Sequence, residues 1–265
     1  MFVSTLLDFI VGLALQHQTN RLRRNMLLAA SIAGNLGLLF FFKYYNFFVQ
    51  NFVQAFTLLG CNLHLSTLQI ILPVGISFYT FQTLSYSIDV YRKKIAPTRN
   101  FIDFAAFVSF FPQLVAGPIE RAANLLPQFY TQRVFSYHKA AKGMRQILWG
   151  LFKKMVIADN CAVYADKIFA QPDVYGGSTL LLGALFFAFQ IYGDFSGYSD
   201  IAIGTGRLFG FTLMRNFAYP YFSRDIAEFW RRWHISLSTW FRDYVYIPMG
   251  GSRGTTLAKL RNIMV

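Results

Sequence analysis

Residues 225–251, DIAEFWRRWHISLSTWFRDYVYIPMGG, decide the expected fold. At 100° per residue the stretch has one apolar face with the i, i+3, i+4, i+7 spacing of an amphipathic helix. The residues of this face are Ile226, Phe229, Trp230, Trp233, Leu237, Trp240, Phe241 and Tyr244. Glu228 and Arg232 are four residues apart, so they are expected to pair on the opposite face. A proline and two glycines are typical of the end of such a helix.

The candidate catalytic residue is His234, which projects about 80° from Ile226 on this helical wheel, at the edge of the apolar face. Arg231 and Arg242 lie on the same flank, and they and Trp230 are candidate substrate-binding residues. A neutral imidazole in a partly dry site can act as a general base at neutral pH. The alternative is an interfacial histidine that only bonds a carbonyl group.

The composition is that of a membrane protein. Of 265 residues, 55% are hydrophobic and 14% are charged, and the mean hydropathy is +0.37. Soluble domains carry about 25% charged residues. The net charge of +13 comes from short basic clusters between apolar runs, a distribution typical of loops that face anionic lipid. A lipid bilayer is therefore the expected partner, and nucleic acid is not.

Cysteine and histidine usage gives no sign of a metal centre. Cys61 and Cys161 are far apart and form no CxxC motif, so neither a disulfide framework nor a cysteine metal site is expected. Four scattered histidines have no metal-ligand spacing. We therefore expect no bound metal and no bound cofactor.

Apolar runs along the chain predict membrane-spanning helices, several of them interrupted. The runs are residues 26–42, 68–90, 101–115, 179–192 and 201–211. A proline and a glycine in the second run predict a kink, and two prolines exclude a continuous helix through residues 112–118. The sequence thus predicts an all-α integral membrane protein with broken or re-entrant segments, forming a single domain over residues 1–265. Both ends look truncated.

Asp194 and Asp200 follow a predicted span directly, where Gly193 and Gly197 are expected to loosen the backbone. The two carboxylates are a candidate catalytic pair, but such residues more often cap helices or bind arginine. Asp194 is also a candidate substrate-binding residue. Ser196 lies in F-S-G rather than G-x-S-x-G, so a nucleophile elbow is not supported.

Three stretches resemble the membrane-bound O-acyltransferase family, and its alginate O-acetylation branch most of all. They are FFPQLVAGPIER at residues 110–121, FQIYGDFSGYSDIAIGTGRLFGF at 189–211, and NFAYPYFSRDIAEFWRRWHISLSTWFRDYVYIPMGG at 216–251. The resemblance implies a ring of transmembrane helices around a thin centre and two catalytic histidines, the first of which maps to His234. No motif for the second follows, so the chain is expected to be a fragment of a longer protein.

The resemblance also implies an activity. An acyl group, expected to be acetyl from acetyl-CoA, would move from a cytoplasmic thioester to hydroxyls of an extracytoplasmic polysaccharide such as alginate. The protein would be multi-pass in the bacterial inner membrane and would work with a periplasmic acetyltransferase or other polysaccharide-modification proteins. The alternatives are a non-enzymatic transporter or channel, in which His234 relays protons, and a scaffold subunit.

Overall fold

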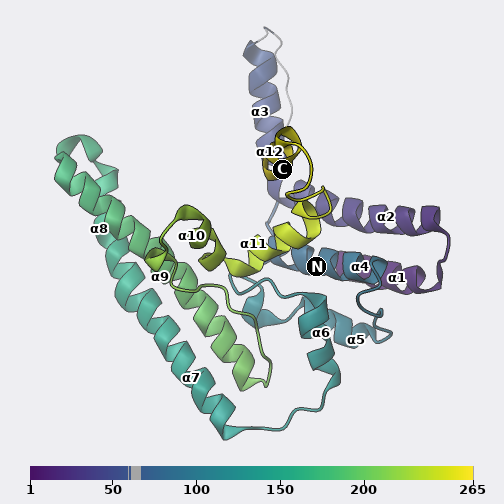
Figure 1. The fold of residues 1–265 in the computed structure, drawn as a ribbon. Helices are drawn as coiled ribbons and strands as arrows, with labels where there is room; N and C mark the ends of the chain where they lie inside the picture. Colours follow the sequence, from purple (N-terminus) through teal and green to yellow (C-terminus); the bar gives the residue numbers. More distant parts are fainter. Residues whose placement is uncertain (59, 61–66, 265) are drawn as a thin grey trace. The chain divides into compact units, whose positions relative to one another are not determined.

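The structure, a computed structural model, describes residues 1–58, 60 and 67–264. Within these ranges every regular element is helical and no β-strand occurs, which confirms the all-α prediction (Figure 1). Cys61 lies outside the described residues, and Cys161 is a free thiol. The chain forms two compact units, Met1–Phe110 with Arg121–Tyr130, and Phe111–Glu120 with Thr131–Val265.

The first unit is built around three packed helices. Its elements are α1 (Phe2–His17), α2 (Arg21–Leu39), a π-helical turn (Phe40–Tyr44), α3 (Tyr45–Leu58), α4 (Ile76–Tyr91), α5 (Phe101–Val108) and α6 (Ala122–Tyr130). Helices α1, α2 and α4 pack against one another. Figure 1 shows α2 and α3 running in different directions on either side of the π-helical turn, a common cause of a bend.

A buried polar cluster joins α1, α2 and α4. The carboxylate of Asp8, fully buried, accepts hydrogen bonds from Ser31 Oγ, from Ser87 Oγ at 2.8 Å and from Asn35 Nδ2 at 2.6 Å. Thr83 Oγ1 donates to Asn35 Oδ1 at 3.0 Å. The hydroxyl groups of Thr83 and Ser87 on α4 therefore pack against protein.

Replacing Asp8 by alanine is expected to lower the free energy of unfolding by about 2–4 kcal/mol, because three buried donors lose their acceptor. Asp8→Asn keeps one acceptor oxygen and is expected to lose less. The measurement is the thermal unfolding midpoint of each purified variant in detergent, followed by tryptophan fluorescence. An Asp8→Ala midpoint equal to that of the wild type would show that the cluster does not stabilise the helices.

Two described helical segments are long and apolar enough to cross a bilayer, Arg21–Leu58 and Gly177–Leu208. The first contains the apolar run at 26–42. The prediction of one kinked helix over residues 68–90 is wrong, because residues 67–73 are not helical and α4 begins only at Ile76. Gly75 lies in the left-handed region at φ 74°, so the proline and glycine start the helix instead of bending it.

The second unit carries the candidate site. Its elements are a 3₁₀ turn (Phe111–Gln113), α7 (Tyr137–Leu151), a π-helical turn (Phe152–Ala158), α8 (Asp159–Ala170), a 3₁₀ turn (Pro172–Val174), α9 (Gly177–Leu208), a 3₁₀ turn (Pro220–Phe222), α10 (Ile226–Arg232), α11 (Ile235–Phe241), a π-helical turn (Arg242–Tyr246) and α12 (Thr256–Met264). Helices α7 and α8 run alongside the long α9 (Figure 1). As predicted, residues 112–118 do not continue a helix.

Helix α9 runs unbroken through the polar segment that was expected to interrupt it, so that expectation is wrong. Its glycines are points of close contact: a Cβ on Gly197 would lie 2.7 Å from the carbonyl oxygen of Gly150, and one on Gly204 would lie 2.6 Å from that of Gly143. The spacing of seven residues on both helices places the two glycine pairs in register. These residues bring the backbones of α7 and α9 together instead of loosening one of them.

The prediction of one helix over residues 225–251 is also wrong. Helix α10 ends at Arg232, α11 starts at Ile235, and His234 between them has a left-handed backbone at φ 43°. Backbone hydrogen bonds from the segment at 216–218 hold this break: Ile235 N donates to Asn216 O, and Ala218 N donates to Arg232 O, both at 2.9 Å. The Glu228–Arg232 pair forms as predicted, at 2.5 Å.

Candidate functional site

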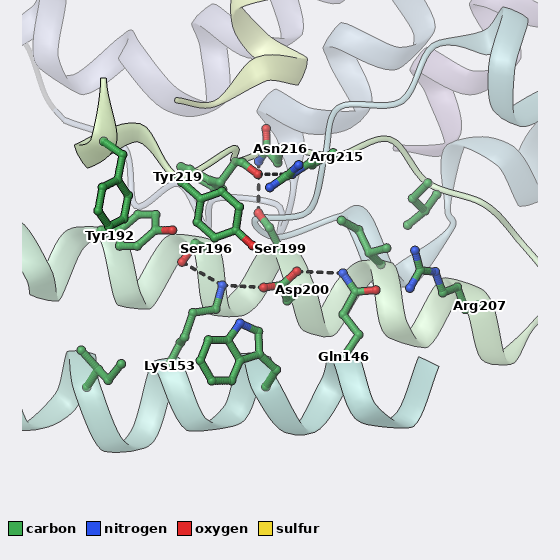
Figure 2. Close-up of a pocket in the computed structure, with 16 residues that line it drawn as sticks. Gln146, Lys153, Tyr192, Ser196, Ser199, Asp200, Arg207, Arg215, Asn216 and Tyr219 are labelled. Carbon is green, nitrogen blue, oxygen red and sulfur yellow. Dashed lines mark hydrogen bonds and ion pairs between the residues drawn. The ribbon is translucent and has the colours of Figure 1, made fainter. Parts of the chain in front are cut away.

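A cavity of about 620 Å³ opens between α7, α9 and residues 213–222 of the second unit. Most of the residues that line it are polar, and Figure 2 shows these side chains converging from α7, the turn after it, α9 and the segment after α9. The labelled polar residues are Gln146, Lys153, Tyr192, Ser196, Ser199, Asp200, Arg207, Arg215, Asn216 and Tyr219. Trp149, Phe217 and Phe222 add aromatic surface.

A partly buried ion pair forms one wall of this cavity. Lys153 Nζ lies 2.5 Å from Asp200 Oδ2 and donates to Ser196 Oγ at 3.0 Å. Gln146 Nε2 donates to Asp200 Oδ1 at 2.8 Å, so both carboxylate oxygens have partners (Figure 2). Gln146 Oε1 is buried and has no hydrogen-bond partner among the described residues. The carboxylate is thus compensated, and an acceptor on Gln146 remains available.

The cavity carries more positive than negative charge, because Lys153, Arg207 and Arg215 are set against Asp200 alone. Arg215 Nε donates to the Phe217 carbonyl at 2.5 Å, and its guanidinium lies 5.2 Å from the centre of the Tyr219 ring. Arg207 forms no ion pair within the described part of the chain. Such a wall suits an anionic ligand.

His234 is half-buried and lies next to this wall without lining the cavity itself. The Phe195 ring meets the imidazole edge-on, with centroids 4.7 Å apart. His234 Nδ1 lies 3.1 Å from Asn216 Oδ1, and Asn216 does line the cavity. His234 is outside both candidate spans, and burial lowers its pKa to about 4, so the imidazole is neutral at physiological pH.

Of the other predicted site residues, Asp200 lines the cavity, whereas Trp230, Arg231, Arg242 and Asp194 do not. Trp230 is 54% exposed and Arg231 is exposed, while Arg242 is exposed and pairs with Asp243 at 2.8 Å. Asp194 pairs with Lys154 at 2.7 Å. The binding roles of these four side chains stay predictions. The expectation of structural pairing for Asp194 and Asp200 is confirmed, although the partner of each is a lysine and not the expected arginine.

Several residues of the site were not singled out from the sequence, among them Gln146, Lys153, Arg207, Arg215 and Asn216. The lysine stood out only as a basic residue in an apolar run, and nothing in the spacing linked it to Asp200. Asn216 lies in the quoted motif, yet its contact with His234, 18 positions later, depends on the helix break that was not foreseen.

The comparison with known proteins defines the class. Residues 93–265 match the model of MBOAT, the membrane-bound O-acyltransferase family. The match covers more than half of the chain, so the chain belongs to this family, whose members are membrane proteins.

Three curated relatives show which members of this family the chain is similar to. The chain is 49% identical over 238 residues to a protein of Azotobacter vinelandii described as "Probable alginate O-acetylase AlgI", covering 90% of this chain and 47% of the relative. It is 46% identical over 264 residues to the protein of that description in Pseudomonas aeruginosa, covering 98% and 50%. The "Peptidoglycan O-acetyltransferase" of Helicobacter pylori is 39% identical over 289 residues, with 99% and 54% covered. The chain spans about half the length of these relatives.

Proposed function

We propose that the protein is a membrane-bound O-acyltransferase that transfers acetyl groups from a cytoplasmic thioester, acetyl-CoA, to hydroxyl groups of an extracytoplasmic polysaccharide such as alginate. One observation carries the proposal: a half-buried, neutral imidazole lies one hydrogen bond from the wall of a basic cavity. Two of the relatives described above are alginate O-acetylases by description and a third is a peptidoglycan O-acetyltransferase, so acetyl transfer to a glycan is the favoured reaction.

In this mechanism His234 is the general base. Its unprotonated nitrogen takes the proton of an acceptor hydroxyl, and the oxygen attacks the thioester carbonyl. The tetrahedral oxyanion then collapses, the C–S bond breaks, and the leaving thiolate takes the proton back from the imidazolium. The products are an acetyl ester and a free thiol. A base with a lowered pKa is already unprotonated at neutral pH, which favours the first step.

The basic cavity is proposed to receive the donor. Acetyl-CoA carries phosphate groups, and Arg207 and Arg215 offer guanidinium groups that pair well with phosphate oxygens. Lys153 forms an ion pair with Asp200, and its proposed role is to hold the cavity wall in place. Arg231 and Arg242 are exposed basic residues and are proposed to attract the anionic donor from outside, while Trp230 and Asp194 keep their proposed contacts with substrate.

The proposed setting is a multi-pass protein of the bacterial inner membrane, in which residues 1–265 belong to one membrane domain. The candidate spans Arg21–Leu58 and Gly177–Leu208 would contribute to a ring of helices. Residues 112–118 would form a protein-lined, re-entrant segment. A contact within the second unit supports this: Ser199 Oγ on α9 donates to the Ala116 carbonyl at 3.5 Å. A periplasmic acetyltransferase or another polysaccharide-modification protein is the proposed partner.

The test uses the full-length protein, purified in detergent and reconstituted in vesicles with labelled acetyl-CoA and alginate oligosaccharides. We expect labelled acetyl ester on the oligosaccharide. Movement of acetyl or proton across the bilayer without ester formation would instead indicate a transporter. Ester formation that persists only through an added partner protein, and that is unchanged by His234→Ala, would indicate a scaffold.

A further inference from the structure

The carboxamide of Asn216 is the hub of the hydrogen bonds around His234. The residue is fully buried, and both atoms of its amide have partners. Nδ2 donates to Ser199 Oγ at 3.1 Å, and Ser199 Oγ donates in turn to the Ala116 carbonyl at 3.5 Å. On the other side, Oδ1 faces Ser236 Oγ at 2.9 Å and His234 Nδ1 at 3.1 Å.

The directions of these bonds settle the orientation of the amide. Ser236 N, a backbone donor, lies 3.3 Å from Asn216 Oδ1, and a flipped amide would place an NH₂ group against this N–H. The atom facing Ser236 and His234 is therefore the acceptor oxygen. An acceptor at 3.1 Å requires a proton on His234 Nδ1, which leaves Nε2 unprotonated in the neutral ring.

We propose that Asn216 is a positioning residue, which holds His234 in the Nδ1–H tautomer so that Nε2 is the atom that accepts the proton. The inference rests on the proposed function of His234 as general base. It deepens that function by assigning the reacting nitrogen and the group that selects it. The wrong tautomer would turn the lone pair toward Asn216 and leave no base for the acceptor hydroxyl.

The backbone of Asn216 supports the same arrangement. Its carbonyl accepts a hydrogen bond from Ile235 N at 2.9 Å. The side chain of Asn216 therefore holds His234, which lies at the helix break, and its main chain holds Ile235, the next residue. The left-handed φ of His234 costs energy for a non-glycine residue and persists because these bonds fix it. One residue thus sets both the position and the protonation pattern of the imidazole.

The amide, rather than a carboxylate, faces the imidazole. The acidic side chains of the helices packed nearby pair elsewhere: Asp194 with Lys154, Asp200 with Lys153, and Glu228 with Arg224 and Arg232. The titratable Tyr192 and the cationic Arg215 belong to the neighbouring cavity wall. A neutral partner holds the tautomer without stabilising the imidazolium, which agrees with a base that stays unprotonated.

The first variant for the test is Asn216→Leu in the full-length protein. Loss of the tautomer is expected to lower kcat for acetyl transfer by about 10²- to 10⁴-fold, with the KM for acetyl-CoA changed by less than about threefold. The matched control is Asn262→Leu, because Asn262 is also buried and bonds the Gly251 carbonyl at 3.0 Å but does not contact His234. The control is expected to keep its kcat. Equal kcat values for wild type and Asn216→Leu would overturn the inference.

The second variant is Asn216→Asp, which is nearly isosteric with the wild type. It tests the positioning role of Asn216 even if Asn216→Leu does not fold. A carboxylate keeps the acceptor for Nδ1–H but stabilises the imidazolium, so the acid limb of the kcat profile is expected to move to higher pH by about 1–3 units. Activity is retained at the alkaline end. If Asn216 had a purely structural role, the substitution would change protein yield or thermal stability, and the acid limb of the kcat profile would stay at its wild-type pH.

The two failures can be told apart. If His234→Ala transfers acetyl at the wild-type rate, the proposed function fails and this inference with it. If His234→Ala is inactive while both Asn216 variants keep the kcat and the pH profile of the wild type, only the assignment of Asn216 is wrong.

Discussion

Replacing His234 by alanine is expected to lower kcat for acetyl transfer by about 10²- to 10⁴-fold, the usual contribution of a general base. The imidazole is neutral and half-buried, and its contacts are Asn216, Ser236 and two phenylalanine rings. The variant leaves the arginines of the cavity in place, so binding of acetyl-CoA is expected to change little. The measurement is single-turnover acetyl transfer by the full-length protein, together with equilibrium binding of labelled donor.

The matched control for this variant is His138→Ala. His138 is exposed in the first turn of α7 and is not part of the cavity wall. It is expected to transfer acetyl at the wild-type rate. A His234→Ala protein that keeps both its fold and its kcat would exclude the imidazole as proton acceptor.

Gly197→Val is expected to have the largest effect on the fold. A Cβ at this position would lie 2.7 Å from the Gly150 carbonyl oxygen and 3.2 Å from Lys154 N, both backbone atoms that cannot move without separating α7 from α9. Overpacking of this kind costs about 1–3 kcal/mol or more, and a branched side chain is expected at the upper end. Because Lys153 lies in the π-helical turn that continues α7 and Asp200 lies on α9, the cavity is expected to be lost as well.

The measurement for Gly197→Val is the thermal unfolding midpoint in detergent, followed by acetyl-CoA binding. Gly177→Val is the control on the same helix, since a Cβ there meets no atom within 4 Å. Its midpoint is expected to stay close to that of the wild type. A Gly197→Val protein as stable as Gly177→Val would contradict the close packing of α7 on α9.

The sequence predicted the helical class, the apolar runs within Arg21–Leu58 and Gly177–Leu208, and the break at residues 112–118, because hydrophobicity and proline act locally. It did not predict the continuity of α9. Gly193 and Gly197 were expected to loosen the helix, whereas their role depends on the partner helix. The matching glycine spacing at 143 and 150, and at 197 and 204, was the available signal.

The site was predictable in part. His234 stood out because an imidazole at the edge of a tryptophan-rich stretch is unusual, and it does lie beside a cavity. The apolar spacing of residues 225–251 is that of a single helix. The structure has a break at His234 instead, because the hydrogen bonds of Asn216 stabilise the interrupted backbone. Asn216 acts through tertiary contacts, which spacing along the chain cannot reveal.

The proposed mechanism depends on a half-buried, neutral imidazole that accepts the proton. Its most direct test is the pH dependence of kcat/KM for acetyl transfer by the full-length wild-type protein, because this ratio reports the ionisation of the free enzyme. With the pKa of His234 lowered to about 4 by burial, the base is available at every pH above that value and is lost as the pH falls through it. We predict a ratio that is nearly constant from about pH 8 to pH 5 and falls below about pH 4. A fall centred near the ordinary histidine value of about 6.5 would contradict the buried site described for His234.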